Sequence, residues 1–426
     1  MKEDFLHFIW KYGYFSIQDL KTTEGKKLVI KSRGFHNHSN GPDFSNGSVL
    51  IDNIEWLGHI EIHKQSSDWL LHKHQHDKNF DNVVLHVVWN EDKPIINSSG
   101  VRIPCLELKD RVNKSLLNKY ENLLLQKSWI ACGNQISTID TQQVNFWLQS
   151  LAMDKLEERA KEVFTLGEKL NFHWEQLFLI YLFRAFGLKQ NKDAFDALAK
   201  KLPVELINKY RHAPYKIEAL LFGIGGFLNN RKSIESYHEQ LSTEYNYLKH
   251  KHQLTEIPMT YWKFGRIRPA NFPTLRIAQL SNLLSADRSG FQFIIEESQA
   301  VILKQLTEVT TSEFWETHYQ FEKTSVVKSK ELGKARIQLI LLHAIVPILF
   351  SFGKYRRDDR LVEKAINIFE SIPAESNTII TKWKSSGIKA KHALESQALL
   401  HLKKKYCDQY RCTSCQIGHQ ILSKNT

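Results

Sequence analysis

The hydrophobic pattern of this chain changes its period near residue 140, and this change constrains the fold more than any other feature. Between residues 26 and 108, apolar residues form short runs separated by Gly, Asn, Asp and Pro, which is typical of β-strands. Beyond residue 140 they recur at steps of four, as in Val144, Leu148 and Ala152, which is typical of amphipathic helices. The sequence therefore predicts an α+β protein in which a sheet-containing module precedes a large helical region.

Five runs in the first part are candidate strands, and they cover residues 27–31, 48–51, 58–63, 83–89 and 101–108. An amphipathic stretch at residues 5–10 precedes them. A short helix is expected near residues 66–72, because serines can cap its start and Asp68 would favour the helix dipole. The predicted order is helix, three strands, helix, strand, in a mixed sheet.

The later part contains several helical candidates with prolines at the breaks between them; they cover residues 177–186, 218–228, 274–284, 339–350 and 361–372. We therefore divide the chain into an α/β module at 1–110, a connector at 111–134 and a helical domain at 135–400. Residues 401–426 form a cysteine-bearing tail that we expect to pack back on the connector.

Composition narrows the functional class. The 426 residues carry a formal net charge of +12, which makes polyanions such as nucleic acids plausible partners. Five cysteines, an odd number in a long chain, argue against a disulfide framework and for a reducing compartment. The longest apolar stretch, at 339–350, falls short of the roughly 18 residues of a membrane span. We expect a cytoplasmic protein without a membrane anchor.

Histidines are concentrated in the sheet-containing module. Eight of the 19 lie between residues 36 and 86, namely His36, His38, His59, His63, His72, His74, His76 and His86. Side chains two apart on a strand share a face, so His59, Glu61 and His63 are expected to project together.

A second polar row is predicted on the short helix. Asp68, His72 and His76 recur at helical steps of four and would share one face. Imidazole and carboxylate groups are the usual ligands of divalent ions, and a mixed set of oxygen and nitrogen donors suits Mg, Mn or Zn. If the two rows converge, they form a metal site. Solvated polar histidines and an ordinary Pro-Asp turn are the alternative interpretation.

Longer motifs run through most of the chain. They are Gly41-Pro42-Asp43-Phe44, Trp56-x-Gly58-x-Ile60-Glu61-Ile62-His63, Ser67-Asp68-Trp69, His72-x-His74-x-x-Asp77, Val84-Leu85-His86-Val87-Val88, Arg266-x-Arg268-Pro269-x-Asn271-Phe272-Pro273, Arg276-Ile277-Ala278-Gln279-Leu280 and the tail from Tyr406-Cys407 to Ile417-Gly418. Together they resemble the bacterial family known as domain of unknown function 2851. That resemblance supplies no activity.

The N-terminal part also resembles the restriction-endonuclease-like PD-(D/E)xK nucleases. Pro42-Asp43 opens one strand and Glu61 follows eighteen positions later on the next, in a matching order of elements. The resemblance implies that Asp43 and Glu61 hold one or two divalent ions, which bind a phosphate and activate water, with help from a lysine. Here His63 occupies the lysine position. Either His63 acts as ligand or base, or a β-bulge brings Lys64 to the site.

The favoured hypothesis is a divalent-metal-dependent nuclease acting on DNA or RNA. Its catalytic candidates are Asp43, Glu61, His63 and Lys64, and its metal ligands would be Asp43, Glu61, His72 and His76, holding Mg or Mn, with Zn as an alternative. A non-catalytic nucleic-acid-binding or scaffold protein with structural metal sites is the second hypothesis. A His-rich zinc hydrolase of a small substrate is the third.

The tail holds a compact set of thiols, Cys407-x4-Cys412-x2-Cys415. Three thiolates leave a tetrahedral ion one ligand short, and Cys132, Cys105 or His419 could complete it. We favour Cys132. Some PD-(D/E)xK nucleases close an iron-sulfur cluster in a similar way, with one distant cysteine and three near the end, so both Zn and an iron-sulfur cluster remain open. Unliganded reduced thiols are the alternative.

A basic, aromatic stretch lies between Tyr245 and Arg276. Cations that neutralise phosphates and rings that stack on bases suit a nucleic-acid groove. The candidate nucleic-acid-binding residues are Lys263, Arg266, Arg268 and Arg276. The equally weighted alternative is that the arginines pair internally while the aromatic rings fill a core.

Overall fold

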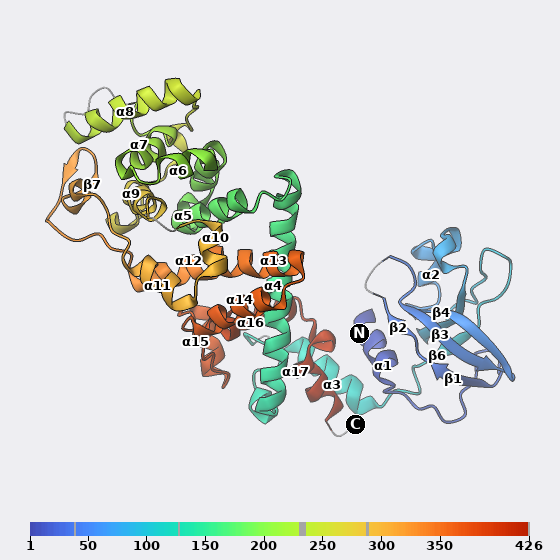
Figure 1. The fold of residues 1–426 in the computed structure, drawn as a ribbon. Helices are drawn as coiled ribbons and strands as arrows, with labels where there is room; N and C mark the ends of the chain where they lie inside the picture. The colour runs from blue at the N-terminus through green and yellow to red at the C-terminus, as the bar shows by residue number, and fades with distance from the viewer. Residues whose placement is uncertain (38–39, 127, 230–235, 287–288, 425–426) are drawn as a thin grey trace. The chain divides into compact units, whose positions relative to one another are not determined.

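A computed structural model describes residues 1–37, 40–126, 128–229, 236–286 and 289–424, so His38 lies outside the described residues. The chain forms a six-stranded mixed sheet near the N-terminus, and the rest of the chain is mostly helical (Figure 1), which confirms the α+β class. It divides into two compact units. The first comprises residues 1–148, 382–388 and 400–426, and the second comprises residues 149–381 and 389–399.

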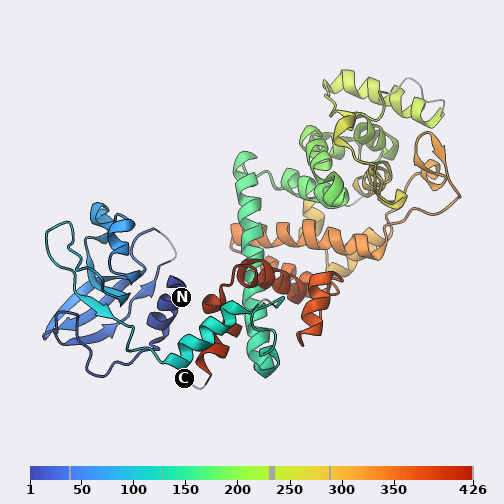
Figure 2. The same ribbon diagram turned by 180° about the vertical axis from the view of Figure 1, so that it is seen from behind.

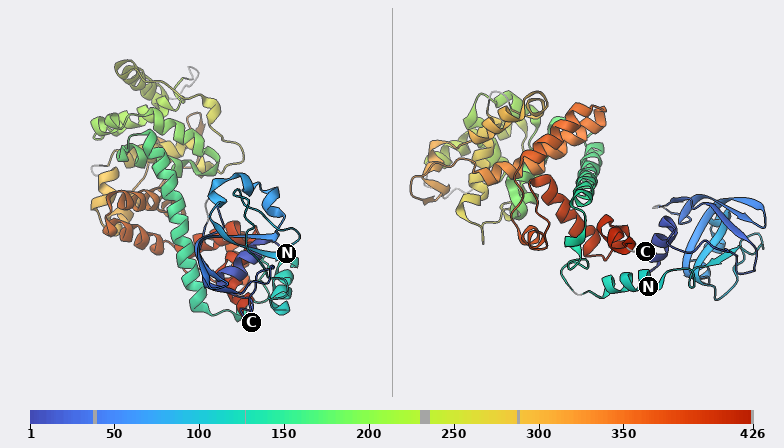
Figure 3. Two further views of the ribbon diagram at one scale, coloured as in Figure 1. Left: turned by 90° about the vertical axis from the view of Figure 1, so that its right-hand side faces the viewer. Right: turned by 90° about the horizontal axis from the view of Figure 1, so that it is seen from below.

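The sheet of the first unit is antiparallel at one side and parallel at the other (Figure 3). Its strands are β1 (Leu28–Ser32), β2 (Phe35–His36), β3 (Phe44–Ile51), β4 (Ile54–Gln65), β5 (Val83–Asn90) and β6 (Cys105–Glu107). Their order is β1-β3-β4-β5-β6, with β2 paired to β3. Strands β1, β3 and β4 form an antiparallel meander, whereas β5 runs parallel to β4 and β6 parallel to β5.

The turn between β3 and β4 sets the register of the central strands. Asp52 and Asn53 both have positive φ angles, 47° and 70°, which is the combination that a two-residue hairpin turn requires and that Asp and Asn tolerate. Ile51 therefore pairs with Ile54, and at the far end of the hairpin Phe44 pairs with Ile60. This register brings Asp43, next to Phe44, beside Glu61.

Helix α1 (Glu3–Tyr12) packs on β4. Its apolar side buries Phe5, Phe8 and Ile9, and it ends at Gly13, whose φ of 73° suits a glycine C-cap. The opposite, partly exposed side carries Glu3 and His7, four residues apart. Helix α1 thereby places two titratable side chains over the sheet.

Segments far apart in sequence complete the first unit. Helix α3 (Lys114–Leu125) packs against the C-terminal helix α17 (Gln416–Ser423), and opposite views of the ribbon show them side by side (Figures 1 and 2). The 3-10 turn η9 (Cys412–Ser414) contacts α1 and α17. Tyr12 of α1 stacks on His419 of α17, with ring centroids 4.2 Å apart.

The remaining elements are mainly helices, in the order α4 (Thr141–Lys169), α5 (Trp174–Lys201), α6 (Val204–Tyr210), α7 (Pro214–Ile224), α8 (Ser236–His252), α9 (Pro273–Leu284), α10 (Phe291–Glu296), α11 (Gln299–Thr307), α12 (Lys334–Ile340), the π-helical turn η7 (Leu341–Ile345), α13 (Val346–Arg356), α14 (Asp359–Ser371), α15 (Thr378–Ser385) and α16 (Ala393–Leu402). A small hairpin of β7 (His318–Gln320) and β8 (Lys323–Thr324) lies among them.

The apolar stretch expected at 339–350 belongs to a longer helical run, Lys334–Arg356. By length and composition this run of 23 residues is able to cross a membrane, in contrast to the expectation from the sequence. However, 72% of its most apolar window is buried inside the protein, as in the core helix of a globular unit. Length and composition alone are therefore weak evidence for a membrane span.

Candidate functional site

Asp43 and Glu61 meet where β3 begins beside β4. The backbone N–H of Asp43 donates to Oε2 of Glu61 at 3.0 Å, and the N–H of Ile62 donates to Oδ2 of Asp43 at 3.0 Å. Glu61 is buried and Asp43 is partly exposed. The hairpin register and these two bonds hold Asp43 and Glu61 at neighbouring positions of adjacent strands.

Two histidines contact the Glu61 carboxylate, and a third lies against one of them. Oε1 of Glu61 lies 3.2 Å from Nε2 of His74 and 3.5 Å from Nε2 of His63. Nε2 of His63 lies 3.1 Å from Nδ1 of His72. One ring nitrogen from each of His63, His72 and His74 falls within 4.8 Å of the other two. We call these three histidines with Asp43 and Glu61 the His-acid cluster.

The helical row that the spacing predicts does not form. Helix α2 covers only Asp68–Leu71, and Lys73, with a φ of 62°, redirects the chain into the 3-10 turn η1 (His74–His76). His74 rather than His76 therefore lies beside His72 and Glu61. His76 is exposed, and no contact with the cluster is found for it among the described residues.

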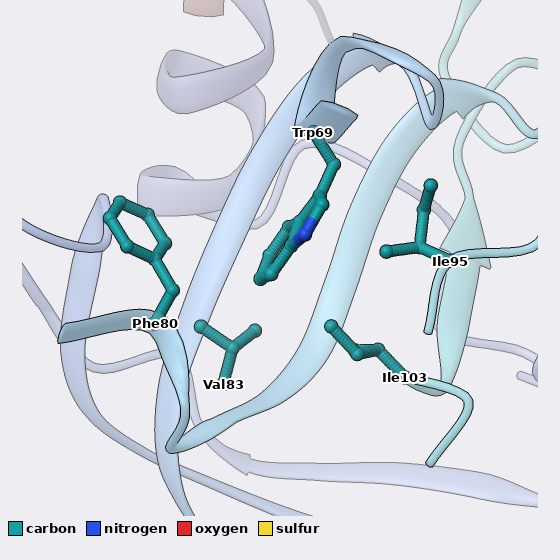
Figure 4. Packing of buried hydrophobic residues seen from close by; sticks show 5 residues of the cluster. All are labelled: Trp69, Phe80, Val83, Ile95 and Ile103. Atoms are coloured by element: carbon teal, nitrogen blue, oxygen red, sulfur yellow. The ribbon is translucent and has the colours of Figure 1, made fainter. Parts of the chain in front are cut away.

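Aromatic side chains hold the His74 ring in place. Phe80 stacks on it with ring centroids 3.8 Å apart, and Trp69 meets it edge-on at 5.3 Å. Both aromatic residues belong to a buried hydrophobic group that also contains Val83, Ile95 and Ile103 (Figure 4). This core therefore restricts the orientation of a residue in the cluster, as supporting residues around metal sites do.

Two further histidines contact residues of the His-acid cluster. His86 of β5 is fully buried, and its Nε2 lies 2.8 Å from Nδ1 of His63. His7 of α1 places Nε2 at 3.3 Å from Oδ2 of Asp43. Sequence reasoning assigned no role to His7, His74 or His86. In the sequence, His86 stands out as a polar residue inside an otherwise apolar strand. His7 stands out as a polar residue four positions after Glu3 in an amphipathic helix.

Burial shifts the protonation of the cluster strongly. Burial, and then the neighbouring Asp43, raise the pKa of Glu61 to about 9. Burial, followed by His86 and His74, lowers the pKa of His63 to about 2, and burial lowers the pKa of His86 to about 3. At neutral pH the imidazoles of His63 and His86 are therefore neutral and Glu61 is protonated. Neutral imidazole is the form that binds metal ions, and a cation would take the place of the Glu61 proton.

Lys64 lies away from the cluster. Strand β4 pairs with β5 without interruption from Ile60 to His63, and the register shift lies earlier, between His59 and Ile60. Within these described strands no bulge after Glu61 turns Lys64 round, and its side chain is exposed on the face opposite His63.

The four cysteines of the predicted thiol site come together in the first unit. Cys132, Cys407, Cys412 and Cys415 line one cavity of about 20 Å³. Burial and then the neighbouring thiols raise the pKa of Cys132 to about 12, and similar causes raise the pKa of Cys412 to about 11. The other candidates for a fourth ligand lie elsewhere: Cys105 is in β6, and Nε2 of His419 is 3.1 Å from the hydroxyl of Tyr14.

The basic stretch of the second unit divides into exposed and buried residues. Lys263, Arg266 and Arg268 are exposed. Arg276 is buried in α9, where it donates to Oε1 of Gln279 at 2.6 Å and to Oδ1 of Asn271 at 2.7 Å. These internal hydrogen bonds give Arg276 a structural role, as the alternative interpretation of the basic stretch expects.

Comparison with known proteins gives a family and no activity. No curated protein and no solved structure matches the chain. A family model described as protein of unknown function (DUF2851) matches residues 3–378, which include the His-acid cluster and Cys132 but stop before the three tail cysteines. The chain therefore belongs to the DUF2851 family of proteins of unknown function.

Proposed function

We propose that the first unit is a divalent-metal-dependent phosphodiester hydrolase, a nuclease acting on DNA or RNA, with the His-acid cluster as its metal site. The observation that carries this proposal is the grouping of three imidazole nitrogens, two of which contact the buried carboxylate of Glu61, while the backbone N–H of Asp43 donates to the same carboxylate.

The donor set favours a transition metal. Nitrogen donors from three histidines and one or two carboxylates suit Zn²⁺ or Mn²⁺ better than Mg²⁺, which prefers oxygen ligands and retains water. His63, His72 and His74 would supply nitrogen, and Glu61 and Asp43 would supply oxygen. Because His72 is exposed while His63 and Glu61 are buried, the cluster is open to solvent on one side.

The order of elements supports a phosphodiester as the substrate. Helix α1, the antiparallel meander β1-β3-β4, the short α2 and the parallel β5 follow the order of the PD-(D/E)xK nucleases that the sequence resembles. Asp43 and Glu61 occupy the positions of the two acids, and His63 that of the lysine. A net charge of +12 and the exposed Lys263, Arg266 and Arg268 are compatible with a polyanionic substrate.

Each residue of the cluster would have a separate task. A bound divalent ion supplies Lewis acidity, which polarises a phosphate oxygen and lowers the pKa of water. Asp43 and Glu61 would hold the ion and offset its charge. His7 would keep the Asp43 carboxylate oriented, since its ring nitrogen contacts Oδ2. His86 would orient the His63 ring through the contact at Nδ1, which leaves Nε2 facing Glu61.

The test is digestion of labelled single- and double-stranded DNA and RNA with Mn²⁺, Zn²⁺ or Mg²⁺. Glu61→Gln removes a charged ligand at constant size and should lower the rate by at least about 100-fold. Glu55→Gln is the matched control, because Glu55 lies on the same strand but is exposed and bonded to Ser48. Equal digestion by wild type and Glu61→Gln would show that a contaminant cleaves the substrate.

Metal titration separates the alternative functions. Metal binding that Glu61→Gln weakens, without any cleavage of nucleic acid, would favour the non-catalytic or scaffold hypothesis. Metal-dependent cleavage of a small aryl phosphate or ester, with polynucleotides left intact, would favour the zinc hydrolase of a small substrate. Neither outcome is expected if the nuclease proposal holds.

We also propose that Cys132, Cys407, Cys412 and Cys415 hold a second metal, either Zn²⁺ or an iron-sulfur cluster. Four thiols that line one small cavity match the ligand number of a closed structural site. Metal analysis and an absorption band near about 400 nm distinguish iron-sulfur from zinc. Colourless, metal-free protein isolated under anaerobic conditions would contradict the proposal.

A further inference from the structure

The second unit contains a pocket that shares no residue with the His-acid cluster, the thiol site or the basic stretch. Helices α4, α5 and α12, with the turn η7 and the start of α13, enclose a cavity of about 400 Å³. Ala185, Leu188, Leu339 and Pro347 form its apolar part. Its volume lies within the range of small-molecule sites, which is roughly 300–1,000 Å³.

The polar part of the pocket is strongly basic. Arg159, Arg184, Lys189 and Lys192 line it, against a single acid, Glu162. The two arginines are already engaged: Arg184 pairs with Asp196 at 2.7 Å, and Arg159 donates to the carbonyl of Leu342 at 2.8 Å.

Unlike the two arginines, the two lysines are available to contact a ligand. Lys189 and Lys192 are exposed, and neither forms an ion pair within the part of the chain that the structure describes. Two cationic side chains at the rim of a partly apolar pocket would attract a negatively charged ligand.

Irregular backbone forms two walls of this pocket. Leu188 has φ 52° and ψ −163°, a combination that side chains other than glycine avoid, and it interrupts the helical geometry of α5. The other irregularity is the π-helical turn η7, which follows α12. Strained residues and π-helical turns are concentrated at functional sites in proteins. Both irregularities here contribute lining residues, Leu188 and His343.

The charged residues around His343 give the pocket a positive electrostatic potential. The side chain of His343 is exposed at the pocket, and desolvation by the surrounding protein, together with the positive charges of Arg159, Lys192 and Lys155, lowers its pKa. The imidazole is therefore neutral at pH 7 and able to donate or accept a hydrogen bond, while the surrounding positive potential opposes a cationic ligand and favours an anionic one.

We propose that this pocket binds a small organic anion, with its charged group at Lys189 and Lys192 and its apolar body against Ala185, Leu188, Leu339 and Pro347. A phosphate, sulfonate or carboxylate would satisfy the same lysines, so the proposed class is an oxyanion attached to an apolar group. The proposal concerns the second unit alone and does not depend on the function proposed for the His-acid cluster.

The test compares two fluorescent probes that differ mainly by one negative charge. 8-Anilinonaphthalene-1-sulfonate carries a sulfonate on an aromatic body, and N-phenyl-1-naphthylamine is its uncharged analogue. Lys192→Gln should weaken sulfonate binding about tenfold and leave binding of the neutral probe unchanged, because only a charged contact is lost. Lys161→Gln is the control, since Lys161 is an exposed lysine of α4 that does not line the pocket.

A second variant distinguishes this pocket from other apolar surfaces. Leu339→Trp fills the cavity and should abolish the saturable binding of both probes, with circular dichroism used to establish that the helices remain. Competition by phenyl phosphate and by benzoate then shows which oxyanion is preferred. The proposal is overturned if wild type does not bind the sulfonate probe, or if Lys192→Gln and Lys161→Gln bind it equally.

Discussion

His63 differs from the lysine that the PD-(D/E)xK resemblance calls for, and its neighbour Lys64 provides a direct test of this difference. His63 is 1% exposed and lies against Glu61, whereas Lys64 is exposed on the other face of β4. We predict that His63→Gln weakens Zn²⁺ or Mn²⁺ binding at least about tenfold and lowers any hydrolysis, since a ligand or its support is lost. Lys64→Gln should leave both unchanged. Calorimetric metal titration and digestion assays measure the two effects.

The opposite result has an equally definite meaning. If Lys64→Gln abolished hydrolysis while His63→Gln left metal binding intact, the lysine would reach the reacting phosphate and the histidine would be a buried structural residue. The register that pairs Glu61 with His86 and His63 with Val88 would then have to change.

Glu218 is expected to make the stability of the second unit depend on pH, independently of both proposed metal sites. This residue of α7 is 4% exposed, and its Oε1 accepts a bond from Nε1 of Trp315 at 2.6 Å. Burial raises the pKa of Glu218 to about 6, although hydrogen bonds from Trp315, Tyr237 and Ser312 oppose the shift. Because the folded-state pKa lies above the usual 4.5, the stabilising contribution of this group is complete below pH 4.5 and is lost as the pH rises through about 6.

Glu218→Gln should therefore raise the free energy of unfolding at pH 8 by about 2 kcal/mol and change it little at pH 4. Urea unfolding followed by circular dichroism at both pH values measures the difference. Glu205→Gln, an exposed residue at the start of α6, is the control and should shift neither curve. Parallel stability curves for wild type and Glu218→Gln would contradict a raised pKa.

At the scale of elements, the short α2 and the aromatic group beneath it decide which histidines face Glu61. Phe80→Leu removes the ring that stacks on His74 and should cost about 1–2 kcal/mol of stability. It should also weaken metal binding about tenfold, because the His74 ring loses its support. Ile95→Val is the matched control, since Ile95 belongs to the same buried group. Thermal unfolding and metal titration of both variants separate general destabilisation from loss of positioning, and equal metal affinities would exclude the positioning role.

The same elements show what the sequence could predict. Short apolar runs and turn residues located five of the six strands of the sheet but missed β2, and the Pro42-Asp43 and Glu61 spacing identified a pair that the hairpin register brings together. His74 was missed because its position depends on one backbone angle, the positive φ of Lys73, which no periodicity reveals. His86 and His7 were missed because their roles arise from contacts between separate elements. The π-helical turn that carries His343 is likewise set by packing rather than by a local pattern.

At the scale of the whole molecule, the first unit is built from both ends of the chain. Helix α17 packs on α3, η9 packs on α1, and the tail cysteines lie in one cavity with Cys132, which comes after α3. In the unfolded chain, bringing Cys132 to the tail requires closure of a very long loop, whose entropic cost grows only slowly with its length. A metal held by all four thiols would favour the folded state over the open chain, because its binding energy contributes to folding.

Cys132→Ser tests this role of the tail. If the proposed site exists, this variant should lose most of the bound zinc or iron, and the unfolding transition of the first unit should move to lower temperature by several degrees, since a structural metal contributes directly to folding. Cys105→Ser is the matched control: Cys105 is a buried cysteine in β6, and this variant should keep its metal content whatever its effect on the sheet. Metal analysis and thermal unfolding, with and without a chelator, measure both quantities.

We expect a chelator to lower the transition temperature of wild type and Cys105→Ser, but not that of Cys132→Ser. Equal metal contents in the two variants would show that Cys132 is not a ligand.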